Sequence, residues 1–262
     1  MAIRSPAVAG AFYPEDPTDL RDMIAKFLDD AEDIEISDRL CGLVEPHAGY
    51  IYSGPTAAYG YKLLSKYSRE IKKVILLGPS HFAAFFGAAE SDAEIWRTPL
   101  GDVEIGKLSE KAKNKELFSL HPAAHGPEHC LEVQLPFIQT VLADFTLYPL
   151  LVSDISPDTL ANEIARQFDE HTVVIASSDL SHYHQYDVAK KRDHVANETV
   201  PALNINKFET SGDACGKTAI LTLMYLAKKL KWKGTFLDYK NSGDTAGPKD
   251  GVVGYGCYAF YK

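Results

Sequence analysis

Three short apolar runs, each followed within six positions by a histidine, constrain the fold of this chain more than any other feature. The runs cover residues 40–45, 74–77 and 172–176. The histidines that follow them are His47, His81 and His182. Apolar, β-branched runs of this length are typical of strands buried on both faces of a parallel sheet. Ligands bind beyond the carboxyl ends of such strands, so we expect the three histidines to converge on one crevice.

Segments with helical periodicity separate these runs and extend the pattern. The expected helices are 17–30, a helix starting at 53, 157–168, 187–203 and 215–230. Further strands are expected at 146–152, 234–239 and 252–261. This alternation predicts an α/β fold, a single-domain α/β/α sandwich over residues 1–262 with a mainly parallel central sheet. The remaining expectations are a β-hairpin insertion at 82–105, helices at 108–117 and 128–142, and a connector at 204–210.

The charge balance limits the class of partner. With 27 basic and 36 acidic residues the formal net charge is −9, which argues against non-specific nucleic-acid binding. The first residues hold no apolar signal segment, and no apolar run approaches the roughly 20 residues of a membrane helix. The four cysteines form no C-x-x-C pair and predict no disulfide framework. We therefore expect a cytoplasmic protein with neither a nucleic-acid nor a membrane partner.

His47, His81 and Cys215 are the residues best suited to bind a metal. Each histidine stands at a strand exit, and Cys215 stands where a helix is expected to begin. The helix dipole there is expected to lower the pKa of the thiol and favour the thiolate. Two imidazoles and one thiolate, with one position left open, suit iron, copper or zinc better than magnesium or calcium. The alternative is an ordinary structural role for each residue.

Asp179 and His182 form a second candidate pair, three residues apart after a strand. A carboxylate beside a histidine orients the ring and raises its basicity, as a general base requires. The alternative role for Asp179 is to cap a short turn.

A histidine-rich segment lies in the middle of the chain. His121, His125 and His129 are spaced four apart, but the two prolines and the glycine between them argue against a continuous helix and so against a triple-histidine metal site. The helix expected at 128–142 instead places His129 and Glu132 on one face of its first turn.

Seven motifs are spread over nearly the whole chain. They lie at 6–14 (PAVAGAFYP), 46–54 (PHAGYIYSG), 77–81 (LGPSH), 128–137 (EHCLEVQLPF), 178–182 (SDLSH), 214–216 (ACG) and 253–255 (VGY). Together they resemble the Memo family, which is named for a mediator of receptor-driven cell motility and is also widespread in bacteria and archaea.

The resemblance implies a fold similar to that of the class III extradiol ring-cleaving dioxygenases, which bind non-haem iron(II). It implies that His47 and His81 match their two histidine ligands, that Cys215 stands where they have a carboxylate, and that His182 matches their acid/base. Memo-like proteins are linked to iron or copper redox chemistry and, in animals, to binding of phosphotyrosine peptides. Microbial members are often grouped with an AMMECR-type protein and a radical S-adenosylmethionine protein, which implies pathway partners.

Two functions from different classes follow as expectations. The first is a metal-dependent redox enzyme, with iron as the expected metal and copper or zinc as alternatives. His182 would act as acid/base with Asp179 orienting it, His129 and Glu132 would lie in or near the second shell, and Tyr52 and Phe12 would line the substrate side. The second is a binding module that captures a phosphorylated or anionic peptide in the same crevice without turnover. A zinc hydrolase is a third, less favoured, expectation.

Overall fold

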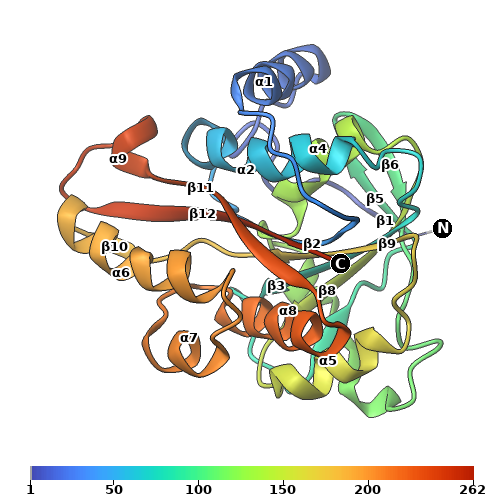
Figure 1. Ribbon diagram of the computed structural model, residues 1–262. Helices are drawn as coiled ribbons and strands as arrows, with labels where there is room; N and C mark the ends of the chain where they lie inside the picture. Colours follow the sequence, from blue (N-terminus) through green and yellow to red (C-terminus); the bar gives the residue numbers. More distant parts are fainter. Residues whose placement is uncertain (1) are drawn as a thin grey trace.

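The computed structural model describes residues 2–262, which form an α/β/α sandwich around a nine-stranded sheet (Figure 1). The order of the strands is β10-β12-β2-β9-β3-β8-β4-β7, and β11 pairs with β12. The four central strands are parallel: β2 (Leu40–Glu45), β9 (Thr172–Ser177), β3 (Lys73–Pro79) and β8 (Thr146–Val152). The expected sandwich and its mainly parallel centre are confirmed.

The strands at both edges of this parallel core are shorter or run antiparallel. The C-terminal strand β12 (Val252–Tyr261) is antiparallel to β2 and pairs on its other side with β11 (Lys233–Asn241) and β10 (His182–His184). The opposite edge is formed by β4 (Ala88–Glu90), antiparallel to β8, and β7 (Phe118–Leu120).

Helices cover both faces of the sheet (Figure 1). One face carries α1 (Pro17–Asp30), α2 (Tyr50–Ser65) and α4 (Leu135–Val141). The other carries α5 (Pro157–Ala165), α6 (Tyr186–Thr199), α7 (Ile205–Ser211) and α8 (Lys217–Leu230). Neighbouring residues of a strand point to opposite faces, so Leu43 packs in the first core and Val44 in the second. The four central strands are therefore predominantly apolar, as in other doubly covered sheets, and their few polar residues lie mainly at the strand ends.

Local signals explain where several helices begin. The side chain of Asp16 accepts hydrogen bonds from the backbone N–H groups of Thr18 and Asp19, with Pro17 at the first helical position of α1. Ser156 caps α5 in the same way, through the N–H of Thr159. Helix α2 begins at Tyr50 rather than at residue 53, because the backbone N–H groups of residues 52 and 53 already bond to the carbonyl of Gly49.

The insertion expected at 82–105 is wrong in its first half. Strand β4 joins the main sheet, and the hairpin is limited to β5 (Ile95–Thr98) and β6 (Gly101–Glu104). With β1 (Ile3–Arg4) these two strands make a separate three-stranded sheet. The N-terminus of the chain thus supplies a strand that local periodicity could not reveal.

Three other local predictions are wrong in whole or in part. The segment 108–117 contains only a 3-10 turn at Lys115–Leu117, because the buried carboxylates of Glu90 and Glu163 bind the backbone N–H groups of Ser109 and Lys113. The helix expected at 128–142 forms only in its second part, as α4, after a 3-10 turn at Glu132–Gln134. A separate short helix, α3 (Pro122–His125), precedes the segment. The connector at 204–210 is helix α7, which Asn204 caps by accepting from the N–H of Lys207.

No helix in residues 2–262 combines the length and the apolar character that crossing a membrane would need. The last short helix, α9 (Ser242–Thr245), lies between β11 and β12 and begins with a capping box in which Asn241 and Asp244 each bind the other's backbone.

Candidate functional site

The segments that follow β2 and β3 meet the segment that precedes α8. His47, His81 and Cys215 each direct a ligand atom to this place, and these atoms lie within 4.8 Å of one another. Nε2 of His47 is 3.2 Å from Sγ of Cys215, and the rings of His47 and His81 have centroids 5.4 Å apart. Parallel strands bring their carboxyl ends to one edge, which is why residues so far apart in sequence meet here.

The backbone after β9 holds Cys215 in place. The N–H of Cys215 donates to the carbonyl of Asp179 at 3.2 Å, and the N–H of Gly216 donates to Oγ of Ser178 at 2.8 Å. A Cβ added at Gly216 would lie 2.6 Å from the carbonyl oxygen of Ser177, so this approach needs glycine. The loop before α8 therefore packs closely against the end of the sheet and holds the thiol of Cys215 there.

The expected lowering of the thiol pKa is wrong for the metal-free protein. Burial and the nearby Asp179 carboxylate raise the pKa of Cys215 to about 12. Cys215 precedes the first residue of α8 by two positions, so the helix end does not offset the loss of solvation. A metal that coordinates the thiol would reverse this balance by deprotonating it.

Glu128 supports His81 and was not found by sequence reasoning. Its carboxylate accepts Nδ1–H of His81 at 2.9 Å and the backbone N–H of His81 at 2.8 Å, and it also accepts the backbone N–H groups of His129 and Cys130. Burial opposes its ionisation, but the hydrogen bonds from His81 and the backbone outweigh that effect and lower the pKa of Glu128 to about 2. Its oxygens are fully engaged, so we assign it to orienting His81 rather than to a second metal group with His81 and His129.

His182 is oriented by a backbone carbonyl and not by Asp179. Nδ1 of His182 donates to the carbonyl of Leu180 at 2.8 Å, which leaves Nε2 as the free, proton-accepting atom. The Asp179 carboxylate instead accepts the backbone N–H of His47 at 2.7 Å. Burial raises the pKa of Asp179 to about 6. The carbonyl of Leu180 thus takes the orienting role expected of Asp179, and Asp179 instead holds the loop that carries His47.

A cavity of about 400 Å³ lies beside these residues. His129, Asp179 and His182 line it together with the aromatic side chains of Phe12, Tyr52, Tyr183 and Tyr255. Tyr183 is exposed and has a φ of 61°, a left-handed conformation that non-glycine residues rarely adopt. Among residues 2–262, no lysine or arginine lines this cavity.

Glu132 lies away from the crevice and anchors the N-terminal arm. Its carboxylate accepts the backbone N–H groups of Ala7 and Val8 and the hydroxyl of Tyr13, and it pairs with Arg4 at 2.7 Å. The expected shared face with His129 is absent, because this segment is a loop and a 3-10 turn rather than the first turn of a helix. Glu132 supports the crevice mainly through the arm, which carries Phe12.

His129 takes part in the crevice while the other two histidines of its segment do not. Its ring stacks on His81 with centroids 4.8 Å apart and contacts Phe12 at 4.9 Å. Nε2 of His125 donates to the carbonyl of Ala89, and His121 stacks on Phe85. The three histidines therefore have three separate environments.

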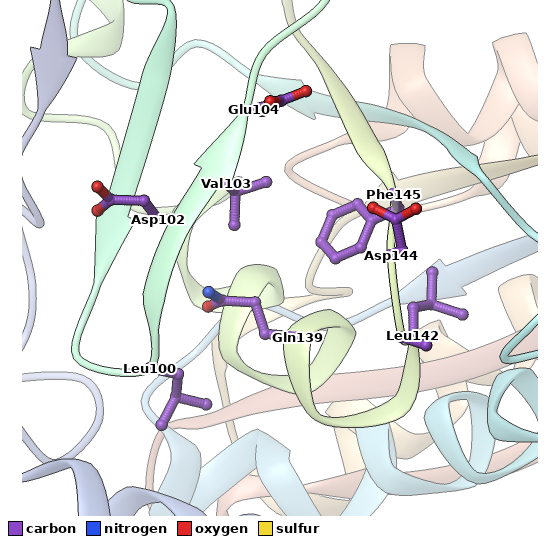
Figure 2. Close-up of a pocket in the computed structure, with 9 residues that line it drawn as sticks. Leu100, Asp102, Val103, Glu104, Gln139, Leu142, Asp144 and Phe145 are labelled. Carbon is purple, nitrogen blue, oxygen red and sulfur yellow. The ribbon is translucent and has the colours of Figure 1, made fainter.

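A second cavity of about 350 Å³, which we call the acidic hollow, lies between the β5–β6 hairpin and the end of α4 (Figure 2). Its acidic side chains are Asp102, Glu104 and Asp144, around an apolar floor that includes Val103 and Phe145. Figure 2 shows the three carboxylates on separate sides of the hollow. Within residues 2–262 they belong to no group of three close ligand atoms.

Comparisons with known proteins find the same similarity, to Memo-like proteins, along nearly the whole chain. A family model described as Memo-like protein matches residues 4–259. A MEMO1 family protein of Nitrosopumilus maritimus is 35% identical over 275 residues, covering 98% of this chain and 99% of its own length. MEMO1 family proteins of Thermoplasma volcanium and Methanopyrus kandleri are each 36% identical, covering 97% and 99% of this chain and 96% and 99% of their own lengths.

Proposed function

Because the chain belongs to the Memo family, we propose that it is a metal-dependent redox enzyme that binds one iron ion through His47, His81 and Cys215. The observation that carries this proposal is the meeting of two imidazole nitrogens and one sulfur within 4.8 Å at the carboxyl ends of parallel strands. A donor set of two nitrogens and one sulfur fits iron, copper or zinc, and copper or zinc would be the alternative metals.

The side chains around these three residues fit a metal as well. Nδ1 of His81 is engaged by Glu128, so its Nε2 remains free to bind. The 3.2 Å between Nε2 of His47 and Sγ of Cys215 matches two ligands on one ion with bonds of about 2.1 and 2.3 Å. Bound iron would supply one-electron chemistry with a substrate or with oxygen.

The residues of the cavity would bind the substrate and move its proton. Nε2 of His182 is free to accept a proton from a substrate hydroxyl, because Nδ1 is committed to Leu180. Phe12 and Tyr52 would form walls that exclude water and orient the substrate. The reacting molecule would therefore be a small one, in keeping with a cavity of about 400 Å³.

Capture of an anionic peptide is supported less well. Such a module needs fixed cations, and the lining of the cavity has none apart from its histidines. An AMMECR-type protein and a radical S-adenosylmethionine protein remain proposed pathway partners.

Anaerobic loading with Fe²⁺ followed by elemental analysis tests the proposal. The parent should bind one iron, and His47→Ala and Cys215→Ser should each bind it at least about 100-fold more weakly, as loss of a ligand predicts. The matched controls are His194→Ala, an exposed histidine, and Cys41→Ser, a buried thiol elsewhere on β2. The ligand assignment is wrong if the two ligand variants retain the iron of the parent.

Turnover is tested separately by oxygen uptake of the iron-loaded protein on a panel of catechols. Uptake that His182→Ala abolishes, without loss of iron, supports the enzyme. Retained binding of a phosphotyrosine peptide with no uptake on any substrate supports the binding module.

A further inference from the structure

His47 and His81 are supported differently on the side away from Cys215. His81 donates its Nδ1–H to a carboxylate, that of Glu128. Nδ1 of His47 lies 3.0 Å from a neutral hydroxyl, Oγ of Ser177. A hydroxyl both donates and accepts, so this contact alone leaves the tautomer of His47 open. The other neighbours of Ser177 decide it.

Gln134 has only one orientation that satisfies its partners. One end of its side-chain amide lies 2.9 Å from the carbonyl of Pro46, which can only accept, so this end is the NH₂ group. The other end then accepts the hydroxyl of Tyr61 at 2.6 Å. The second hydrogen of the NH₂ group points to Oγ of Ser177 at 2.7 Å. Gln134 is therefore a donor to Ser177.

The single proton of the Ser177 hydroxyl is committed elsewhere. Oγ lies 2.6 Å from the carbonyl of Cys130, which can only accept, so Ser177 donates to it. Gln134 occupies one of the two lone pairs of Oγ, and the other faces His47. Oγ can then only accept from His47, whose proton must be on Nδ1. The bare Nε2 is the atom that faces Cys215.

We propose that Ser177, oriented by Gln134, is a positioning residue that holds His47 as its Nδ1–H tautomer and so keeps Nε2 available for a transition-metal cation. Ser177, Gln134 and Tyr61 are all buried, so water does not replace a missing partner in this chain of hydrogen bonds. The inference rests on the proposed function only for the identity of the group that Nε2 binds. The tautomer itself is a property of the metal-free protein.

The tautomer is measured by long-range ¹H–¹⁵N correlation NMR on histidine-labelled, metal-free protein at pH 7.5. In the parent, His47 should show a protonated Nδ1 and a bare Nε2. Ser177→Ala removes the acceptor and should shift His47 toward the Nε2–H form, whereas Ser177→Thr keeps the hydroxyl and should keep the parent tautomer. The matched control is Ser91→Ala, which removes a buried hydroxyl that accepts from Trp96 and should leave His47 unchanged.

Binding of Co²⁺, followed by its thiolate charge-transfer absorption, measures the consequence. Ser177→Ala should weaken Co²⁺ binding about 10- to 100-fold, as loss of an outer partner of a ligand does. Gln134→Met should weaken it less, and should add nothing in the Ser177→Ala background if Gln134 acts through Ser177. Thermal unfolding of the metal-free variants identifies any loss of binding that comes from loss of the fold.

Two results would overturn the proposal: an Nε2–H tautomer of His47 in the parent, or a Ser177→Ala variant with the parent's tautomer and Co²⁺ affinity. A parent that shows the Nδ1–H tautomer, and loses it in Ser177→Ala, supports the positioning role. If that same parent binds no metal, the proposed function fails while the positioning role stands.

Discussion

The cavity beside His182 and the acidic hollow have volumes of about 400 and 350 Å³, yet their ionisable side chains are arranged in opposite ways. Beside His182, residues from five segments that are distant in sequence meet. The histidines there and nearby are paired with a carboxylate, a hydroxyl and a carbonyl. Around the acidic hollow, the carboxylates face solvent. Asp102 pairs with the exposed Arg97, and Asp144 is largely exposed. Size alone therefore does not distinguish a site that can do chemistry from a surface depression.

The difference lies in which atoms are left free. His47, His81 and His182 each have one ring nitrogen held by the protein, so only the other nitrogen can bind a ligand or a proton. The carboxylates of Asp102 and Asp144 in the acidic hollow pair instead with the exposed cations Arg97 and Lys72, and solvent screens these ion pairs. Pre-organisation of this kind is what a metal or catalytic site requires.

The largest expected effect comes from the buried ion pair that anchors the arm. Arg4→Met leaves the carboxylate of Glu132 buried without its cation and removes two hydrogen bonds to backbone carbonyls, so the free energy of unfolding should fall by about 3–5 kcal/mol. Arg97→Met, at the exposed pair of the acidic hollow, should leave the unfolding midpoint nearly unchanged. Denaturant unfolding measures both. If Arg4→Met and Arg97→Met lowered the free energy of unfolding equally, the buried pair would be no more important than the exposed pair of the acidic hollow.

A smaller effect concerns acid stability. The pKa of Glu128 is lowered from 4.5 to about 2, so it contributes stability that is present above about pH 4.5 and is lost as the pH falls toward 2. That contribution is about 3 kcal/mol at 1.36 kcal/mol per unit. Glu128→Gln should therefore flatten the acid limb of the stability curve, measured by urea unfolding between pH 2 and pH 6.

The matched control for this measurement is Asp102→Asn. The pKa of Asp102 is also lowered, by its hydrogen bond with Arg97, but solvent screens this exposed pair. Its variant should change the acid limb far less. A larger change in Asp102→Asn than in Glu128→Gln would contradict the assignment of Glu128 as a buried support.

The smallest expected effect is at the acidic hollow itself. A triple variant, Asp102→Asn, Glu104→Gln and Asp144→Asn, should keep the parent's iron content, because these carboxylates do not converge on a shared point. Elemental analysis after anaerobic loading measures this. Loss of iron from the triple variant would move the metal site to the hollow and reverse the comparison.

The central architecture could be predicted because it depends on apolar runs and their spacing. Strands buried on both faces read as continuous apolar runs, so the sequence shows where each strand ends. The positions of His47 and His81, just after two such ends, follow directly. The loop at 108–117 could not be predicted, since the distant buried carboxylates of Glu90 and Glu163 bind its backbone N–H groups. The late start of the helix within 128–142 could not be predicted either, because the carboxylate of Glu128 binds the backbone N–H groups of His129 and Cys130. Intrinsic helix propensity is weak, so hydrogen bonds from the backbone N–H groups to these carboxylates can replace those of a helix.

The candidate site was predictable in its ligand atoms but not in their supports. Histidine and cysteine are recognised as candidate ligands by their residue type. Their positions after strands and before a helix predict that they lie close together. Ser177 and Gln134 carry no such signal, because serine and glutamine have many uses. The same limit explains Asp179 and Glu132, whose partners, the backbone of His47 and the arm at 7–8, are more than a hundred positions away.

The position of β2 affects how the chain is made in the cell. Its two neighbours in the sheet, β9 and β12, are translated long after it, and β12 ends at Tyr261. At about 5–20 residues per second, β2 waits roughly 10–40 s on the ribosome before its last neighbour exists. During that interval the apolar strand β2 lacks both of its neighbours in the sheet. If the proposed metal centre forms, its three ligands can come together only after Cys215 has been translated, which is long after His47 and His81.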